Sequence, residues 1–371
     1  MAEISESAPI ATNRQFPCKQ CGAKLDYAPG TAVLKCPYCS SEIPIPQSEE
    51  EIKELDFQEY LKKLAEEHET REEHRVKCEK CGAETTLPPE VTAGSCPFCG
   101  ANLVITTQIS RLIKPKALLP FKVMQTQGFE DFRRWINRLW FAPNDLKKYA
   151  QSEGKLVGIY VPYWTYDSDT TSFYRGERGD DYWVTETYTE NENGRSVTKT
   201  RQVRKTRWTP VNGTVWNQFD DVLVMASNSL PRKYADRLEP WDLAGLVPYA
   251  DEFLSGFRAE SYQVDLPAGF EIARQIMDEG ILASIRRDIG GDHQRVGSVK
   301  TSYDKITFKH ILLPVWLSAY RYRDKVYRIL INARTGELQG ERPYSALKIA
   351  AAIAAAIIII AILIAIGTLN K

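Results

Sequence analysis

The longest uninterrupted hydrophobic stretch lies near the C-terminal end of the chain. Residues 349–369 are 21 positions without a charged side chain, and isoleucines fall on every side of the expected helix. At roughly 1.5 Å per residue such a helix is about 31 Å long, which matches the hydrocarbon core of a bilayer. We therefore predict a transmembrane helix over 347–369, with a buried helix of a soluble domain as the alternative.

Apolar residues recur at helical spacing in further stretches. The clearest extends over 128–140, and helices are also expected over 231–243 and 270–287. Another follows Asp56, a suitable N-cap, and its apolar face is made by Phe57, Tyr60, Leu61 and Leu64. Because residues 49–75 carry eleven acidic and five basic side chains, we interpret this helix as a solvated spacer, with a partner-binding helix as the alternative.

Stretches rich in β-branched and aromatic residues predict strands over 118–123, 156–167, 260–266 and 305–321. Residues 327–338 have the pattern of two strands around a turn at 334–336. A hairpin is predicted over 182–190 and 195–208, because Asn193-Gly194 is a strong two-residue turn signal. That turn sets a register in which Glu186 faces Arg201 and Asp180 faces Arg207.

The second strand of this hairpin, 195–208, holds six basic residues and no acidic one. Alone it would suggest a surface for nucleic acid or lipid headgroups. The register favours another interpretation, in which opposite charges meet across the two strands.

All eight cysteines belong to one pattern that occurs twice, sixty positions apart. In each copy, fourteen residues separate one Cys-x-x-Cys pair from a second pair. Such paired turns give the tetrahedral sulfur cage of a zinc ribbon. We predict two structural zinc ions, held by Cys18, Cys21, Cys36 and Cys39 and by Cys78, Cys81, Cys96 and Cys99. The alternatives are disulfides, which the missing secretory signal disfavours, and iron in the same cages.

The expected fold class is α+β, with two N-terminal four-cysteine zinc ribbons joined by an acidic helix, a β-rich domain and a C-terminal transmembrane helix. The expected boundaries are disorder over 1–15, ribbons over 16–46 and 76–106, an acidic helical linker over 47–75, and an aromatic-rich domain over 108–345. Reduced thiolates place the bulk of the chain in the cytoplasm, on a single-pass C-terminal anchor.

The sequence has no Walker A loop, no GxSxG elbow and no cysteine left over as a nucleophile. A cage of four thiolates leaves no open position on zinc for chemistry. The polar cluster over 286–293 is interpreted as the end of a helix with basic residues in its last turn and a glycine stop. We therefore expect no enzyme.

Several longer motifs resemble one bacterial family of membrane-anchored double zinc-ribbon proteins, with TFIIB-type ribbons, often labelled primosomal or helicase-like. They are CxxCGA…CPxC in both ribbons, LLPF (118–121), LWFAPN (139–144), GIYVPYWTYD (158–167), FDDVLVMAS (219–227), IGGD (289–292), TFKHILLPVWLSAYRY (307–322) and NARTGELQGERPYS (332–345). The helicase label does not transfer, because the ATP motifs are missing. The resemblance implies partners among flotillin-type (SPFH) scaffolds and phage-shock-type proteins.

The function expected from these features is a membrane-anchored cytoplasmic adaptor that recruits protein partners. Nucleic-acid binding through the ribbons is the alternative. It is disfavoured by a net charge of zero and by the second ribbon, where residues 78–100 carry one lysine against three glutamates.

Overall fold

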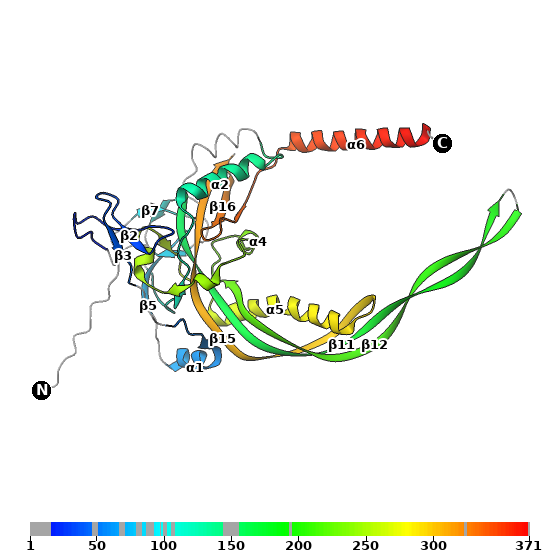
Figure 1. Ribbon diagram of the computed structural model, residues 1–371, viewed down its shortest axis with the longest axis horizontal. Coiled ribbons are helices and arrows are strands. Elements are labelled where there is room, and N and C mark those ends of the chain that lie inside the picture. The colour runs from blue at the N-terminus through cyan, green and yellow to red at the C-terminus, as the bar shows by residue number, and fades with distance from the viewer. Residues whose placement is uncertain are drawn as a thin grey trace.

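The computed structural model describes residues 16–46, 51–66, 71–78, 84–86, 93–96, 98, 102–104, 108–143, 156–192, 195–322 and 325–369. The disorder expected over 1–15 lies outside the described residues. Within them the protein is mixed α/β and rich in sheet, as the sequence predicts, and its last helix projects from the body (Figure 1).

Three long strands form the frame of the molecule. They are β11 (Val157–Glu192), β12 (Arg195–Met225) and β15 (His293–Tyr322). β11 lies between the other two and pairs antiparallel with both, in a described sheet of nine strands. The shorter members are β4 (Leu55–Asp56), β10 (Ala117–Leu118), β13 (Val247–Pro248), β14 (Arg258–Ala259), β16 (Lys325–Asn332) and β17 (Leu338–Gly340).

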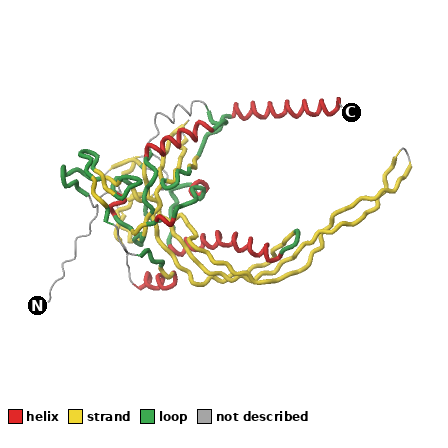
Figure 2. The backbone as a smooth tube through the Cα atoms, viewed as in Figure 1, coloured by secondary structure: helices red, strands yellow, loops and turns green. Residues whose placement is uncertain are grey.

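β11 and β12 are one hairpin, much longer than the sequence suggested. The predicted register is correct, since Glu186 pairs with Arg201 and Asp180 with Arg207. β15 accompanies β11 only as far as Gly179, so the described residues beyond it form a two-stranded ribbon. We call residues 180–207 the arm; it extends far from the body (Figure 2).

Helix α5 (Leu266–Ile289) covers one face of the three long strands (Figure 1). Asp265 caps its start by accepting a hydrogen bond from the Ala268 N–H at 2.8 Å, and Gly290 ends it with a φ of 65°. Its buried face is made by Leu266, Gly269, Phe270, Ala273, Met277, Ile281, Ile285 and Ile289. This spacing of three and four residues is the predicted helical pattern, so the helix expected over 270–287 is confirmed.

The acidic helix is α1 (Phe57–Glu66), and its start is capped as expected, with Asp56 Oδ1 accepting from the Glu59 N–H at 2.7 Å. Its interpretation as a solvated spacer is wrong. Phe57 is buried against Phe270 and Phe308, with ring centroids 5.0 and 6.4 Å away. Among the described residues of the predicted linker over 47–75, α1 is helical and is followed by the strand β5 (Arg71–Lys77).

Helix α2 (Gln125–Arg138) confirms the pattern predicted over 128–140, shifted toward the N-terminus. Phe132 and Ile136 are buried in the core, whereas Trp140 lies beyond the helix and is 78 % exposed. The transmembrane prediction corresponds to α6 (Ala346–Leu369).

Three predicted elements differ in the structure. The helix expected over 231–243 is reduced to α4 (Arg232–Ala235) and a 3-10 turn over Leu243–Gly245, because Pro240 disfavours helix at the residue before it. Residues 260–266 are no strand: the Glu260 N–H bonds to Tyr160 and the Gln263 N–H to Ala226, on two different segments. The strand expected over 118–123 is limited to β10.

The cysteine-containing segments form small sheets of their own. The first contains β1 (Asp26–Tyr27), β2 (Val33–Lys35) and β3 (Glu42–Pro44). The second cysteine-containing segment forms two sheets. In one, β5 pairs with β6 (Glu84–Thr86) and with β9 (Gln108–Leu112). In the other, β7 (Ala93–Ser95) pairs with β8 (Asn102–Val104). A second 3-10 turn, Asp251–Leu254, packs beside β1.

Candidate metal centre

The four cysteines of the first set converge on one point, as predicted. The Sγ atoms of Cys18 and Cys39 lie 3.5 Å apart, as do those of Cys21 and Cys36. All four sulfurs lie within 4.8 Å of one another. A tetrahedral zinc ion with bonds of about 2.3 Å needs sulfur separations of about 3.8 Å. The cluster therefore suits zinc in both ligand type and spacing.

Tight backbone turns aim these sulfurs. At the first, the Gly22 N–H donates to the Cys18 carbonyl at 2.8 Å, and Gly22 has the left-handed φ of 75°. At the second, the Ser40 N–H donates to the Cys36 carbonyl at 3.0 Å. The freedom that glycine gives at positive φ is thus needed at Gly22.

The turns also favour thiolates, the form that binds metal. Backbone N–H groups of Cys21 and Gln20 lower the pKa of Cys18 to about 6, and that of Cys39 lowers the pKa of Cys36. The Ser41 N–H favours the Cys39 thiolate, but burial and the nearby thiols raise the pKa of Cys39 to about 12. Four thiolates this close repel one another, so a cation among them would remove the conflict.

The first cysteine segment is packed onto the domain. The Tyr27 hydroxyl donates to the Phe121 carbonyl at 3.1 Å, and the Ser255 hydroxyl donates to the Leu25 carbonyl at 2.6 Å. The Tyr27 ring lies 5.1 Å from that of Phe253. Cys18 and Cys36 belong to the same buried cluster as these side chains. Metal binding at this site is therefore coupled to the packing of the domain.

The second set is described in part. Cys78 and Cys96 are both buried, in the cluster that includes Phe98 and Leu330. The Arg328 guanidinium donates to the Phe98 carbonyl at 3.2 Å, which ties this segment to β16. Cys81 and Cys99 lie outside the described residues, so the second cage stays a prediction.

A carboxylate cluster that sequence reasoning missed lies where β4 meets β15. Oxygens of Glu54, Asp167 and Asp220 approach within 4.8 Å, and Lys309 lies between Glu54 and Asp221 at 2.9 and 2.8 Å. The pKa of Glu54 falls to about 2, mainly through its hydrogen bond with Asp167, and burial raises that of Asp167 to about 6. Asp167 therefore holds its proton at mildly acidic pH, whereas Glu54 stays ionised beside the Lys309 ammonium group.

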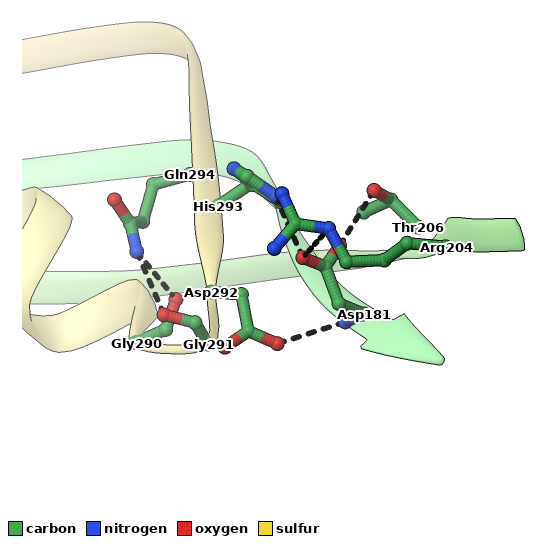
Figure 3. A network of polar contacts seen from close by, with 8 residues as sticks. All are labelled: Asp181, Arg204, Thr206, Gly290, Gly291, Asp292, His293 and Gln294. Carbon is green, nitrogen blue, oxygen red and sulfur yellow. Dashed lines mark hydrogen bonds and ion pairs between the residues drawn. The ribbon is translucent and has the colours of Figure 1, made fainter. Parts of the chain in front are cut away.

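The polar cluster over 286–293 joins the arm to the end of α5 (Figure 3). Asp181 accepts hydrogen bonds from the Thr206 hydroxyl at 2.7 Å and from His293 Nε2 at 3.2 Å, and it pairs with Arg204 at 3.2 Å. Asp292 accepts from the Asp181 N–H at 2.8 Å. These contacts fix the base of the arm, in line with the helix-end interpretation of this cluster.

Helix α6 is the described helix that suits a membrane. Its segment Ala346–Ile364 is long and apolar enough to cross one, and none of it is buried against the protein. Many of its isoleucine side chains are more than half exposed, for example Ile357 at 61 % and Ile364 at 62 %. An apolar surface of this size is costly in water, which is consistent with a C-terminal anchor.

Comparison with known proteins yields a distant relative. No protein-family model matches the chain. The uncharacterized protein YdjG of Bacillus subtilis (strain 168) is 23 % identical over 249 residues, which cover 67 % of this chain and 69 % of the relative. No solved structure matches.

Proposed function

We propose that the chain is a membrane-anchored adaptor that recruits protein partners to the cytoplasmic face of a membrane. In this proposal α6 is the anchor, and each cysteine set holds one structural zinc ion. Metal-binding thiolates require reduced cysteines, which supports a body in a reducing compartment. The observation that carries the proposal is the arm, which projects from the same side of the body as α6 (Figure 1).

On one face of the arm, acidic side chains of one strand pair with basic side chains of the other. Glu186 pairs with Arg201 and Lys205 at 3.3 and 2.8 Å, and Lys199 pairs with Glu190 at 2.9 Å. The Arg207 guanidinium also stacks 5.2 Å from the centre of the Tyr182 ring. These contacts support the cross-strand interpretation of the basic strand, rather than a surface for phosphates.

Side chains alternate along a strand, so the opposite face of the arm holds Asp181, Trp183 and Arg204 near the body. Beyond them, toward the tip, this face carries uncharged hydroxyl and amide groups. This uncharged part is formed by the exposed residues Thr185, Thr187, Thr189, Asn191, Ser196, Thr198, Thr200 and Gln202. Within the described part of the chain, both outer edges of the arm lack a neighbouring strand. We call this surface the polar face.

A two-stranded ribbon is at best marginally stable in water, and open strand edges readily pair with other chains. The polar face is free of charged groups, so covering it has a small desolvation cost. These properties support docking of a protein partner by strand addition to the arm. The resemblance of the sequence motifs points to flotillin-type (SPFH) scaffolds or phage-shock-type proteins as the first partners to test.

The test is a crosslinked pull-down from membranes with the full chain and a short-arm variant. In that variant Asn-Gly joins Val184 to Val203, a pair that already faces across the ribbon. The matched control, Glu190→Gln with Lys199→Gln, keeps the arm length and the polar face. We expect partners to be lost only with the short arm. The adaptor function fails if no protein depends on the arm or on residues 1–106, and crosslinked nucleic acid would favour the alternative.

A further inference from the structure

A cleft lies where the body meets α6. It has a volume of about 610 Å³ and is lined by Asn137, Arg138, Trp140, Lys348, Ala351 and Ala352. Arg138 ends α2, and Trp140 follows it in the chain. Asn137 also belongs to the last turn of α2, whereas Lys348, Ala351 and Ala352 come from the first turns of α6. The proposed adaptor function does not involve this cleft.

Hydrogen bonds hold the two walls together. The Ser345 N–H donates to the Phe141 carbonyl at 2.8 Å. The Lys348 ammonium donates to the carbonyls of Ala142 and Trp140 at 2.8 and 3.2 Å. The start of α6 is therefore fixed against the segment that follows α2, and the cleft is a built feature of the fold.

The chemistry of the lining changes along α6. Arg138 and Lys348 contribute two positive charges to the lining, and Asn137 contributes an amide. One helical turn further, Ala351 and Ala352 leave an apolar wall with room beside it. Close to these residues in the chain, Leu347 and Tyr344 are 82 and 58 % exposed. Tryptophan, tyrosine and basic residues in this arrangement are typical of the boundary between membrane and water.

We propose that this cleft binds an anionic phospholipid, with its phosphate between Arg138 and Lys348 and an acyl chain along Ala351 and Ala352. This site rests on the proposed membrane anchor, since α6 begins at the level of the headgroups only if it spans the bilayer. A guanidinium and an ammonium both recognise phosphate. Free phosphate has the same charge chemistry, but it would leave the apolar wall uncovered, which favours the lipid.

The test uses the full chain in neutral-detergent micelles, titrated with phosphatidylglycerol or phosphatidylcholine and followed by native mass spectrometry. We expect preferential retention of phosphatidylglycerol. Arg138→Gln should weaken it roughly tenfold, the loss of one charge-assisted contact. Ala352→Phe should also weaken it by filling the apolar end without changing charge. The control is Arg134→Gln on the same helix, whose side chain pairs with Asp131 and which should retain the lipid.

Separate outcomes distinguish this site from the anchor. Alkaline extraction of membranes should leave the wild type and Arg138→Gln equally embedded. If the wild type is extracted, the anchor itself fails. If it stays embedded but retains both lipids equally, or if Arg134→Gln matches Arg138→Gln, the lipid site is overturned. Full displacement of phosphatidylglycerol by inorganic phosphate at matched ionic strength would also overturn it, in favour of a simple anion site.

Discussion

Lys309 of β15 and Glu54 are 255 positions apart in the sequence, yet 2.9 Å separates the lysine Nζ from the carboxylate. The lysine side chain is only 10 % exposed and also pairs with Asp221. This ion pair fastens the segment between the two cysteine sets to the central sheet. Removing one member of a buried ion pair lowers stability strongly, because the other charge is left without its partner.

Lys309→Met should therefore destabilise the protein at neutral pH by about 3 kcal/mol, because Glu54 and Asp221 would remain as a partly buried cluster of like charge. The thermal midpoint of the detergent-solubilised chain measures this loss. Lys305→Met is the matched control on the same strand: Lys305 pairs with Asp169 but is 82 % exposed, so its removal should lower the thermal midpoint far less. Equal shifts for the two variants would contradict the role given to Lys309.

Asp167→Asn should instead stabilise the folded protein at alkaline pH. The pKa of Asp167 is raised by burial to about 6, above its unfolded value of about 3.9. The folded state therefore holds the proton more tightly, and this group removes stability as the pH rises through roughly 4 to 6. Asparagine imitates the protonated acid, so the variant should resemble the wild type near pH 4 and exceed it near pH 8. Thermal midpoints at both pH values test this, and a variant less stable than the wild type near pH 8 would refute it.

Local signals explain which parts of the fold the sequence could predict. The Asn193-Gly194 signal predicts the register that the described residues of the arm adopt. The spacing of the first four cysteines likewise predicts that their sulfurs meet, without reference to the remainder of the chain. The face of α5 follows in the same way from helical periodicity. Each of these features depends on residues close to one another in sequence.

Other parts depend on contacts over a long distance. Residues 168–181, which contain Gly176 and Gly179, lie between two predicted strands and are part of neither prediction, yet they belong to β11. A Cβ atom on Gly179 would lie 2.8 Å from Thr206 and 3.0 Å from His293, so the glycine permits close strand packing instead of a turn. The docking of α1 likewise requires Phe270 and Phe308, more than two hundred positions away.

Cys36→Ser should reduce the zinc content of the full chain by one ion, measured by elemental analysis. It should also lower the thermal midpoint, because Cys36 belongs to the buried cluster shared with the domain. Cys78→Ser should remove the other ion. Ser41→Ala, beside the first cage, is the control and should keep both. Wild-type protein without zinc, or an unchanged zinc content in Cys36→Ser, would rule out this assignment.

Asp181→Ala should loosen the arm without unfolding the body. The Asp181 carboxylate accepts hydrogen bonds from Thr206 and His293 and pairs with Arg204. These contacts join both strands of the arm to β15 at the point where β15 ceases to pair with β11. Hydrogen exchange should therefore become faster across 182–204 and stay unchanged in α5 and β16, since local opening depends on local contacts. Glu190→Ala removes an exposed pair near the tip, so faster exchange there should be confined to its neighbours. An arm equally protected in both variants would show that its order does not depend on the Asp181 contacts.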